Sequence, residues 1–440
     1  RRAHGTLSEV LGRAALAGDV EARTLGFRRV AEQELARLPA DTVRALQGYA
    51  GGINAAIEQM GDRLPIELDV LGSAPAPWTP LDTLTIQRAS LWQFGGRIQG
   101  VVLAEAAHRY LPPHLAERFL ALELAEETIV PGGYLAGLGV QEPAVHGAEH
   151  PHGSNQWAVA GSRHAGGRGA LLATDGHVPY TQPSDRYEAH IHGAGYDVVG
   201  MALPGVPTFH NGRNRHVAWG VTNNVSSARD LYLEEVDPTD PTRYRDGAAY
   251  EPFEVRSERI DVRGEPPVEV AVRTTSRGPL VNGLIPSVEP DGDPPLSLRW
   301  TGLEPDDTMT VLLRIPLARS SDEFRATLAL GVGRSLNYGF ADVEGHVGYQ
   351  MVGRIPIRGR VTRGYRRAND PADAWAGYVP FERLPAETDP SRGWIGSANN
   401  PPAPRDYRVP LYGAYADGFR MRRMRTLLES KPKLTIEDMG

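Results

Sequence analysis

The stretch His152–Trp157, HGSNQW, marks the point where the chain changes from helical to strand-like sequence. Upstream, residues 20–38, 41–60 and 81–94 carry apolar residues at three- and four-residue steps, which indicates helices. Downstream come short β-like runs separated by Gly, Asn, Asp and Pro at hairpin distances, which predicts antiparallel sheets. We therefore expect an α+β fold with a mostly helical N-terminal region.

This change of character divides the chain into three predicted segments. Residues 1–124 form the helical region, with breakers at 72–80 and 111–114. Residues 125–153 have no period and are rich in Gly, Pro and His, which is typical of a functional or disordered segment, and we interpret them as a spacer. Residues 154–440 form a β-rich core, with one helix predicted near 320–331, where Ser begins and Gly ends the pattern.

The composition excludes several functional classes. A net charge of −7 argues against nucleic-acid binding, which needs a basic surface. The absence of Cys removes thiol nucleophiles, thiolate metal sites and disulfides. There is no run of 18 apolar residues, so no membrane span is predicted. The chain starts without Met inside an amphipathic pattern and ends where a helix begins, so we expect a piece of a longer protein that lacks its signal region.

The first hairpin after the spacer offers a serine and a histidine for chemistry. A symmetric hairpin centred near Ala165 and Gly166 places Ser154 opposite His177. Opposite residues of an antiparallel pair have Cα atoms about 4.5–5.5 Å apart, within reach of a hydrogen bond or a bridging water. The register depends on the loop, however, and a slip of one residue sends the side chains to opposite faces. The alternative is ordinary turn chemistry, which also uses Gly-Ser-Asn and Asp-Gly-His.

Ser154 needs a base if it is to act as a nucleophile. The chain has no G-x-S-x-G elbow to supply one through a catalytic triad. The α-amino group of Ser154 becomes available if the preceding peptide bond is cut, and such amines titrate at about 7.7–8.0. Gly153 leaves the hydroxyl room to attack its carbonyl carbon, and the spacer lets the new ends separate. These features predict self-cleavage between Gly153 and Ser154.

Several stretches, in order along nearly the whole chain, resemble the penicillin acylases of the N-terminal-nucleophile (Ntn) hydrolase superfamily, which include cephalosporin and acyl-homoserine-lactone acylases. The helical region carries HGTLSEVLG, YAGGINAAI and LGSAPAPWTPLD. The later region carries GSNQWAVAGSRHAGGRGALLATDGHVPY, GVPTFHNGRNRHVAWGVTNNVSSARDLYLEEV, LNYGFADVEGHVGYQMVGRIPIR, WAGYVPFERLP and GWIGSANNPP. Each stretch is weak evidence alone, but their order makes the resemblance specific.

The resemblance implies a four-layer αββα sandwich that matures into a helical α chain and a β chain starting at Ser154. It implies hydrolysis of linear amides, such as penicillins, cephalosporins or N-acyl-homoserine lactones, through an acyl-enzyme. The expected partners are therefore a small acyl amide and the two chains of one precursor, with no nucleic acid and no membrane span. A periplasmic or secreted location is also implied.

The resemblance also assigns catalytic roles. Ser154 matches the nucleophile with its amine as base, and His177 matches a histidine that many members have near it. The backbone N–H of Asn223 and the side chain of Asn337 match the two oxyanion donors. From the residues alone, His177 also fits a strand-end histidine, Asn223 a turn residue and Asn337 a strand-start cap.

Further positions match the family's acyl pocket and substrate mouth. Val178, Phe209 and Val221 match the apolar pocket wall. Arg354 and Arg358 fall where the family places arginines near the substrate, although an arginine on a strand is more often a solvated charge.

No cofactor is expected for the chemistry, but the family binds structural calcium through oxygen ligands. Asp230 matches one ligand position and Glu105 matches the helical-chain ligand. Ser227 replaces an acidic position of some members, which weakens the site or passes coordination to carbonyls and water. An ion pair is the alternative for these acidic residues.

Two functions of another class stay open from the sequence. One is a catalytically silent relative that uses the same scaffold for binding. The other is a zinc hydrolase built on histidines such as His190 and His192, which share one strand face but lack a third ligand at a recognisable spacing.

Overall fold

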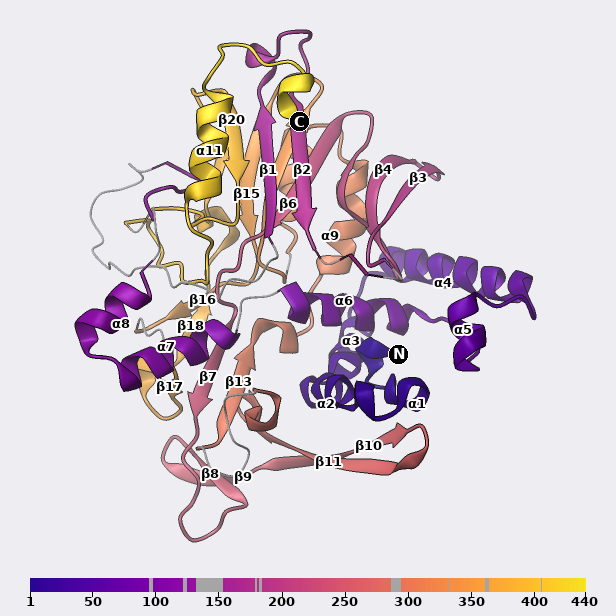
Figure 1. Cartoon of the computed structure of the whole chain (residues 1–440), viewed down its shortest axis with the longest axis vertical. Helices are drawn as coiled ribbons and strands as arrows, with labels where there is room; N and C mark the ends of the chain where they lie inside the picture. The colour runs from indigo at the N-terminus through magenta and orange to yellow at the C-terminus, as the bar shows by residue number, and fades with distance from the viewer. Residues whose placement is uncertain are drawn as a thin grey trace.

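The computed structural model of the chain describes residues 1–94, 98–121, 125–131, 153–178, 180–181, 184–285, 294–331, 333–360, 364–404 and 406–440. Residues 132–152 of the predicted spacer lie outside these ranges. Figure 1 shows the helices of the N-terminal region at and below the lower end of β1 (Gly153–Val159), spread across the width of the molecule. The change of structure at residue 153 agrees with the change of sequence pattern.

The N-terminal region is helical, as predicted. Pro or Gly lies at most of the helix ends, as the breakers in the sequence indicate. The helices are α1 (Ser8–Leu11), α2 (Leu16–Leu25), α3 (Phe27–Leu35), α4 (Ala40–Met60), α5 (Ile66–Leu71), α6 (Pro80–Phe94), α7 (Ile98–Tyr110) and α8 (Pro113–Phe119).

A buried ion cluster ties these helices to the β-rich region. Arg88 on α6 donates from Nε to Glu34 Oε2 of α3 at 2.8 Å and from Nη1 to Asp306 Oδ2 at 3.0 Å. All three side chains are almost completely buried, so removal of one would leave an unpaired charge in the core. The cluster fixes α6, whose last turn carries Trp92 and Phe94 to the cavity described below.

Two antiparallel sheets form the centre of the molecule. The smaller sheet has the order β2–β1–β20, with β2 at Leu171–His177 and β20 at Trp394–Ser397. The larger sheet has seven strands in the order β19 (Ala386–Thr388), β15 (Val347–Val352), β14 (Leu336–Asp342), β6 (Val217–Asn223), β5 (Val206–Arg213), β4 (Tyr196–Leu203) and β3 (Tyr187–Gly193).

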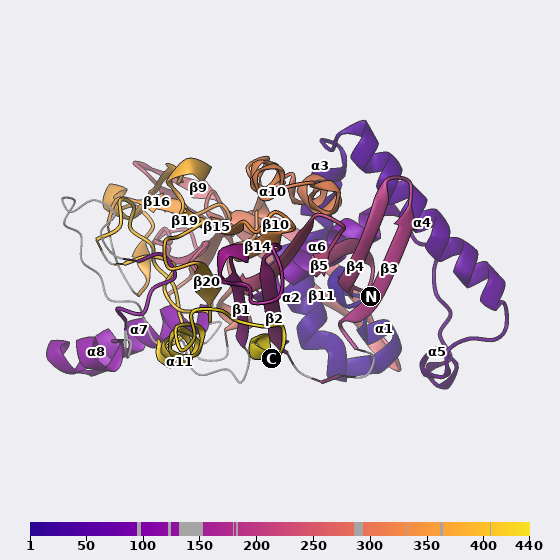
Figure 2. The ribbon, with the colours of Figure 1, turned by 90° about the horizontal axis from the view of Figure 1, so that it is seen from above.

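Helices cover the outer face of each sheet. Seen from above, α11 (Phe419–Leu428), the small sheet, the large sheet and α10 (Ser321–Leu328) follow one another (Figure 2). Met421 and Met424 of α11 pack on the small sheet, and α9 (Thr308–Arg314) and α10 pack on the large one. The predicted α+β fold with four αββα layers is therefore confirmed. The helix predicted near 320–331 is α10, and its N-cap Ser320 accepts the Glu323 N–H.

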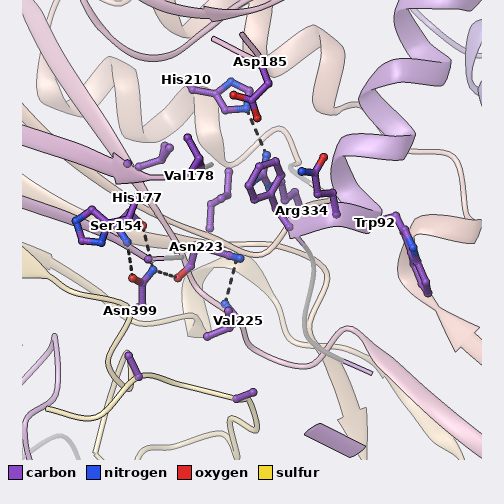
Figure 3. Close-up of a pocket in the computed structure, with 18 of the residues that line it drawn as sticks. Trp92, Ser154, His177, Val178, Asp185, His210, Asn223, Val225, Arg334 and Asn399 are labelled. Carbon is purple, nitrogen blue, oxygen red and sulfur yellow. Dashed lines mark hydrogen bonds between the residues drawn. The ribbon is translucent and has the colours of Figure 1, made fainter. Parts of the chain in front are cut away.

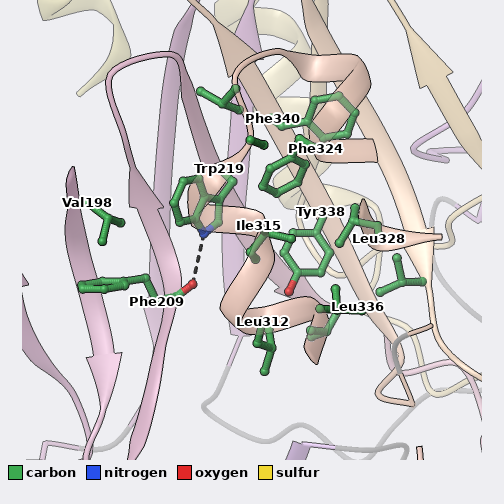
Figure 4. Packing of buried hydrophobic residues seen from close by; sticks show 14 of the residues in the cluster. Val198, Phe209, Trp219, Leu312, Ile315, Phe324, Leu328, Leu336, Tyr338 and Phe340 are labelled. Atoms are coloured by element: carbon green, nitrogen blue, oxygen red, sulfur yellow. Dashed lines mark hydrogen bonds between the residues drawn. The ribbon is translucent and has the colours of Figure 1, made fainter. Parts of the chain in front are cut away.

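The large sheet and its helices enclose an aromatic core. Trp219 of β6 lies against Phe324 of α10, with ring centroids 5.7 Å apart, and Tyr338 and Phe340 of β14 complete the cluster (Figure 4). Each of these side chains is almost fully buried. Rings of this size contribute much of the apolar area removed from water, so this cluster keeps β6 and β14 rigid behind the site.

The remaining strands form small sheets around this centre. Parallel pairing occurs between β17 and β7, whereas the other pairs are antiparallel. These sheets are β13 (Leu296–Trp300), β7 (Arg229–Leu233) and β17 (Arg366–Arg367); β10 (Glu254–Val262), β11 (Glu265–Thr275) and β12 (Gly278–Pro279); β16 (Pro356–Arg358) and β18 (Trp375–Tyr378); and β8 (Arg243–Asp246) and β9 (Ala249–Pro252).

Candidate active site

A cavity of about 1490 Å³ lies where the end of α6 meets the strands β1, β2, β5 and β6. Its lining includes Ser154, His177 and Asn223, three of the residues that the sequence singles out. Figure 3 shows Ser154, Asn223 and Asn399 close together at one end of the cavity and His210 and Arg334 farther along it. The cavity therefore has a polar catalytic candidate at one end and a second polar group at the other.

Asn399 holds Ser154 at two points. The backbone N–H of Ser154 donates to Asn399 Oδ1 at 2.7 Å, and Asn399 Nδ2 donates to Ser154 Oγ at 3.0 Å. Ser154 is the second residue of β1, and only 8% of it is exposed to solvent. The hydroxyl and the nitrogen that would become the α-amine are thus both oriented by one side chain.

Asn399 is itself fixed by its surroundings. Its backbone has φ 62, a left-handed conformation that Asn tolerates better than most residues. Its Nδ2 also donates to the Asn223 carbonyl at 2.9 Å. Arg420 of α11 donates to Asn399 Oδ1 at 3.1 Å and to the Ser154 carbonyl at 2.8 Å. Burial lowers the pKa of Arg420, and the charge of Asp175 raises it.

His177 does not lie opposite Ser154, which corrects the predicted register. The pairs are Gly153 with His177 and Ser154 with Gly176, one residue from the symmetric expectation. The loop between the strands contains a short 3-10 segment at Gly161–Arg163, and the pairing is centred on Ala165 instead of midway between Ala165 and Gly166. Adjacent strand residues point to opposite faces, so the Ser154 and His177 side chains leave the sheet on different sides.

The contacts of His177 are with residues at the end of the β1–β2 hairpin. Its Nε2 lies 3.0 Å from Asp175 Oδ2 and 3.1 Å from Asn155 Nδ2. The Asn155 backbone N–H donates to Asp175 Oδ1 at 3.0 Å. This network braces the end of the β1–β2 hairpin next to Gly153.

Asn223 ends β6 beside Ser154, at a point of backbone strain. Two residues later, Val225 has φ 53, which is unusual for a β-branched residue and costs about 1–3 kcal/mol. The Val225 N–H donates to Asn223 Oδ1 at 3.3 Å. Both residues line the cavity, so the chain bends sharply at the place where the backbone donor was predicted.

Asn337 does not supply the side-chain donor, which corrects a second prediction. It is completely buried, and its Nδ2 donates to Thr222 Oγ1 at 3.1 Å and to Ser397 Oγ at 3.3 Å. Its Oδ1 accepts hydrogen bonds from Asn224 Nδ2 at 2.5 Å and from the Tyr349 hydroxyl at 2.7 Å. With both ends of the amide engaged between the sheets, Asn337 is structural, and Asn399 takes the place beside Ser154.

Two of the three predicted pocket residues line the cavity. Val178 and Val221 do so, but Phe209 is buried in the aromatic core, where its carbonyl accepts from Trp219 Nε1 at 3.0 Å. Side chains alternate along β5, so its neighbour His210 faces the cavity instead. The prediction for Phe209 is therefore off by one residue.

The predicted calcium ligand Asp230 is instead bound by arginines. Its Oδ2 accepts from Arg358 Nε at 2.8 Å, and its Oδ1 lies 3.0 Å from Arg366 Nε. Trp375 Nε1 also donates to the carboxylate. Burial would raise the pKa of Asp230, but Arg358 and Arg366 outweigh burial and hold it below its usual value.

These contacts do not fit a calcium ion, because guanidinium groups occupy the space around both carboxylate oxygens. Glu105 Oε2 accepts the Tyr365 N–H at 2.9 Å, and the Ser227 carbonyl accepts from Arg358 Nη2 at 2.8 Å. Arg358 is therefore part of a buried ion cluster and does not line the cavity, which corrects its predicted role near the substrate. The second predicted arginine, Arg354, pairs with Glu304.

The histidines proposed for zinc do not form a metal site. His190 and His192 are exposed on β3, with nitrogens 2.9 Å and 3.6 Å from Asp197 Oδ1. Arg215 also pairs with this carboxylate. Within the described ranges, the structure contains no group of three or more His, Cys, Asp or Glu side chains arranged to hold a metal.

Sequence reasoning missed Asn399 and Arg420. Asn399 lies in GSANNPP, a stretch that contributes to the resemblance, and Asn is one of the residues that tolerate a left-handed backbone. Arg420 lies on an arginine-rich helix with no pattern to distinguish it from Arg422, Arg423 or Arg425. Their roles depend on contacts with Ser154, 245 and 266 positions away along the chain.

None of the helices in the described ranges combines the length and apolar character that a membrane span requires.

Comparisons with known proteins agree with this architecture. The Penicillin acylase 2 proenzyme of Pseudomonas sp. (strain SE83) is 30% identical over 100% of this chain and 58% of its own length. The acyl-homoserine lactone acylase QuiP of Pseudomonas aeruginosa is 29% identical over 90% of this chain and 50% of its own length. The chain therefore spans between half and three-fifths of these relatives.

The fold has a match among solved structures. The thermostable penicillin G acylase from Alcaligenes faecalis superposes with a TM-score of 0.55 at 24% identity, covering 65% of this chain and 51% of that one. A sequence profile of the family described as Penicillin amidase matches residues 1–440. The chain therefore belongs to the penicillin amidase family.

Proposed function

We propose that the chain carries the catalytic centre of a penicillin-acylase-type amide hydrolase, in which Ser154 forms an acyl-enzyme with a linear acyl amide. The contact of Asn399 with both the nitrogen and the hydroxyl of Ser154 carries the proposal. Membership of the family and similarity to proteins named as penicillin and acyl-homoserine lactone acylases support it.

The first proposed step is self-cleavage. Ser154 Oγ attacks the Gly153 carbonyl carbon, the peptide C–N bond breaks, and the hydroxyl proton goes to the nitrogen, which leaves an ester. Water then hydrolyses the ester and releases the Gly153 carboxylate. The product has a free α-amine on Ser154 and two chains from one precursor, and the family resemblance supports a periplasmic or secreted site for the mature protein.

In turnover, the free amine serves as the base. It takes the proton of Ser154 Oγ as the hydroxyl attacks the substrate carbonyl, and it then returns this proton to the leaving amine. In the second half of the cycle it takes a proton from a water molecule that attacks the acyl-enzyme, which releases the acid and restores the Ser154 hydroxyl. Asn399 Oδ1 holds the nitrogen that carries this amine. The nearby Arg420 charge favours the neutral form of the amine, since a cation next to a base lowers its pKa.

The oxyanion donors proposed for this step are Asn399 Nδ2 and the backbone N–H of Asn223. Both lie at the Ser154 end of the cavity, and Asn399 Nδ2 bridges from Ser154 Oγ to the Asn223 carbonyl. Removal of one such donor typically raises the barrier by about 3–4 kcal/mol. We assign His177 a positioning role through Asn155 and Asp175, without contact to the reacting atoms.

Amide hydrolysis tests the proposal against a catalytically silent binding protein. The protein at its natural full length is assayed with phenylacetyl, glutaryl and pentanoyl 4-nitroanilides beside Ser154→Ala. The acylase hydrolyses at least one of them and the variant none. An unprocessed chain that hydrolyses none of them would instead support the silent relative.

A further inference from the structure

The first residues of the predicted spacer lie against the turn that orients the proposed nucleophile. Residues 126–130, named the strap below, come before the part of the spacer outside the described ranges. The backbone N–H groups of Ile129 and Val130 donate to the carbonyls of Pro401 and Pro402 at 3.0 and 3.1 Å. Both apolar side chains are buried in a cluster with residues of β1, β14, β15 and β20. The strap is therefore packed as part of the core.

Asn400 connects the strap to the turn that carries Asn399. Its Nδ2 donates to the Glu127 carbonyl at 2.7 Å, and its Oδ1 accepts the Ala398 N–H at 3.0 Å. Asn400 is completely buried, so loss of either bond would leave a polar group without a partner. The Asn400 side chain thus ties the residue before Asn399, whose own backbone is left-handed, to the strap.

The Glu127 carboxylate connects the strap to α11. Its Oε1 accepts from Arg422 Nε at 3.1 Å, and its Oε2 lies 2.7 Å from Arg425 Nη2. Only 5% of the Glu127 side chain is exposed, so the carboxylate depends on these two cations for its charge to be compensated. Arg420, which contacts the proposed nucleophile and the proposed oxyanion donor, lies on the same helix two residues before Arg422.

We propose that Glu127 is a positioning residue for the proposed hydrolysis at Ser154, on which this inference rests. Its carbonyl holds the turn of Asn399 and its carboxylate holds the helix of Arg420, so it fixes these two groups relative to each other. Glu127 does not line the cavity and acts from behind it. The strap therefore stays in the mature N-terminal chain, and the site takes contacts from both chains of the processed enzyme.

The test is Glu127→Gln in the protein at its natural full length, with rates normalised to the amount of two-chain protein. The amide keeps the size of the side chain and the carbonyl bond to Asn400, but it removes the charge that holds Arg422 and Arg425. Both arginines are half-exposed, so water solvates them in the variant and the fold persists. We expect kcat to fall at least about tenfold with KM little changed, because a small displacement of a catalytic group has a large effect on the rate. Glu127→Asp keeps the charge and should retain more activity.

Glu126→Gln is the matched control. The Glu126 carboxylate also pairs with Arg422, at 3.0 Å from Nη2, but its side chain is 67% exposed, so its loss should leave kcat unchanged.

A boronic acid that carries the acyl group of the substrate, such as benzylboronic acid for a phenylacetyl amide, adds a readout that general destabilisation does not move. Its tetrahedral adduct with Ser154 needs the oxyanion donors, whereas the carboxylate product does not. Glu127→Gln should raise the inhibition constant of the boronic acid at least about tenfold and leave that of the carboxylate product unchanged. Equal kcat losses in the two glutamate variants, or equal weakening of the two inhibitors, would overturn the positioning role.

Two measurements without turnover separate this inference from the proposed hydrolysis. The mass of the mature N-terminal chain should place its end beyond Val130, and a chain that ends before Glu127 would overturn the inference. In hydrogen–deuterium exchange, Glu127→Gln should speed the exchange of residues 398–400 and of α11, and Glu126→Gln should not. This result supports the role of the strap even if no amide is hydrolysed, an outcome that would refute only the proposed function. Unchanged exchange together with wild-type kcat in Glu127→Gln overturns the inference and leaves the proposed function intact.

Discussion

The amide of Asn399 lies against Ser154 at both of its ends, with Oδ1 2.7 Å from the backbone nitrogen and Nδ2 3.0 Å from Oγ. Asn399→Ala removes a proposed oxyanion donor and the acceptor for the Ser154 nitrogen. We expect kcat of the processed enzyme to fall by about 10²–10³-fold with a smaller change in KM. Steady-state kinetics on one amide substrate measures both.

Asn337→Ala is the matched comparison, because Asn337 was the donor predicted from the sequence. Its four hydrogen bonds lie between the sheets, so its loss should lower the midpoint of thermal unfolding. The assignment of the donor to Asn399 would be contradicted if Asn337→Ala lowered kcat at unchanged stability while Asn399→Ala remained active.

Arg420 should act by positioning Asn399. Its guanidinium donates to Asn399 Oδ1, to the Ser154 carbonyl and to Asn155 Oδ1 at 2.7–3.1 Å. Arg420→Met should lower kcat by about 100-fold, since a displacement of about 1 Å at a catalytic group has that effect. The variant should also shift the lower limb of the pH–rate profile upward, because the amine pKa rises without the nearby cation.

Arg423→Met provides the control for this variant. Arg423 lies on the same helix but is exposed and outside the cavity lining. Equal losses of kcat in the two variants would show that the effect comes from α11 as a whole and would contradict a specific role for Arg420.

Gly153 should be required for the self-cleavage rate. A Cβ at this position would lie 3.0 Å from His177 Nδ1, 3.1 Å from Arg420 Nη2 and 3.2 Å from Asn399 Oδ1. Gly153→Ala therefore displaces the groups that orient the scissile bond, and the precursor should accumulate in a time course of processing. Gly176→Ala is a suitable control, since a Cβ there meets open space. Wild-type processing of Gly153→Ala would show that this crowding is irrelevant.

The Asp230 cluster should stabilise the fold without a metal. Asp230→Asn leaves Arg358 and Arg366 without their buried carboxylate, and we expect the free energy of unfolding to fall by about 3–5 kcal/mol. Prolonged dialysis against EDTA should leave the unfolding midpoint unchanged. A midpoint that drops on chelation and recovers with calcium would contradict the replacement of the ion by arginines.

The same cluster predicts an acid dependence. The folded-state pKa of Asp230 is below its unfolded value of about 3.9, so its contribution is complete above that value and is lost as the pH falls through the folded pKa. The stability difference between wild type and Asp230→Asn should thus be constant from neutral pH to about 5 and should shrink below about 3.9. Denaturant titrations at a series of pH values measure this difference.

Much of the architecture is predictable from local sequence. The helical period before residue 124, the strand runs after Gly153 and the Ser320 cap of α10 are local signals, and the structure follows them. Ser154, near the start of β1, and Asn223, the last residue of β6, line the same cavity.

The errors have a common physical origin in long-range geometry. The length of the β1–β2 loop sets the register, and His177 therefore pairs with Gly153 instead of with Ser154. The alternation of β5 decides that His210, rather than Phe209, faces the cavity. The packing of the two sheets buries Asn337, and Arg358 and Arg366 lie against Asp230, where the sequence predicts an ion ligand. None of these depends on a local pattern.

The intact mass of the protein, expressed at its natural full length and separated under denaturing conditions, tests the central claim most directly. The account predicts two chains, the second with Ser154 as its first residue, and a single uncut chain in Ser154→Ala. Wild-type protein that remains a single chain, or that is cut elsewhere, would contradict the assignment of Ser154 as a nucleophile activated by its own amine.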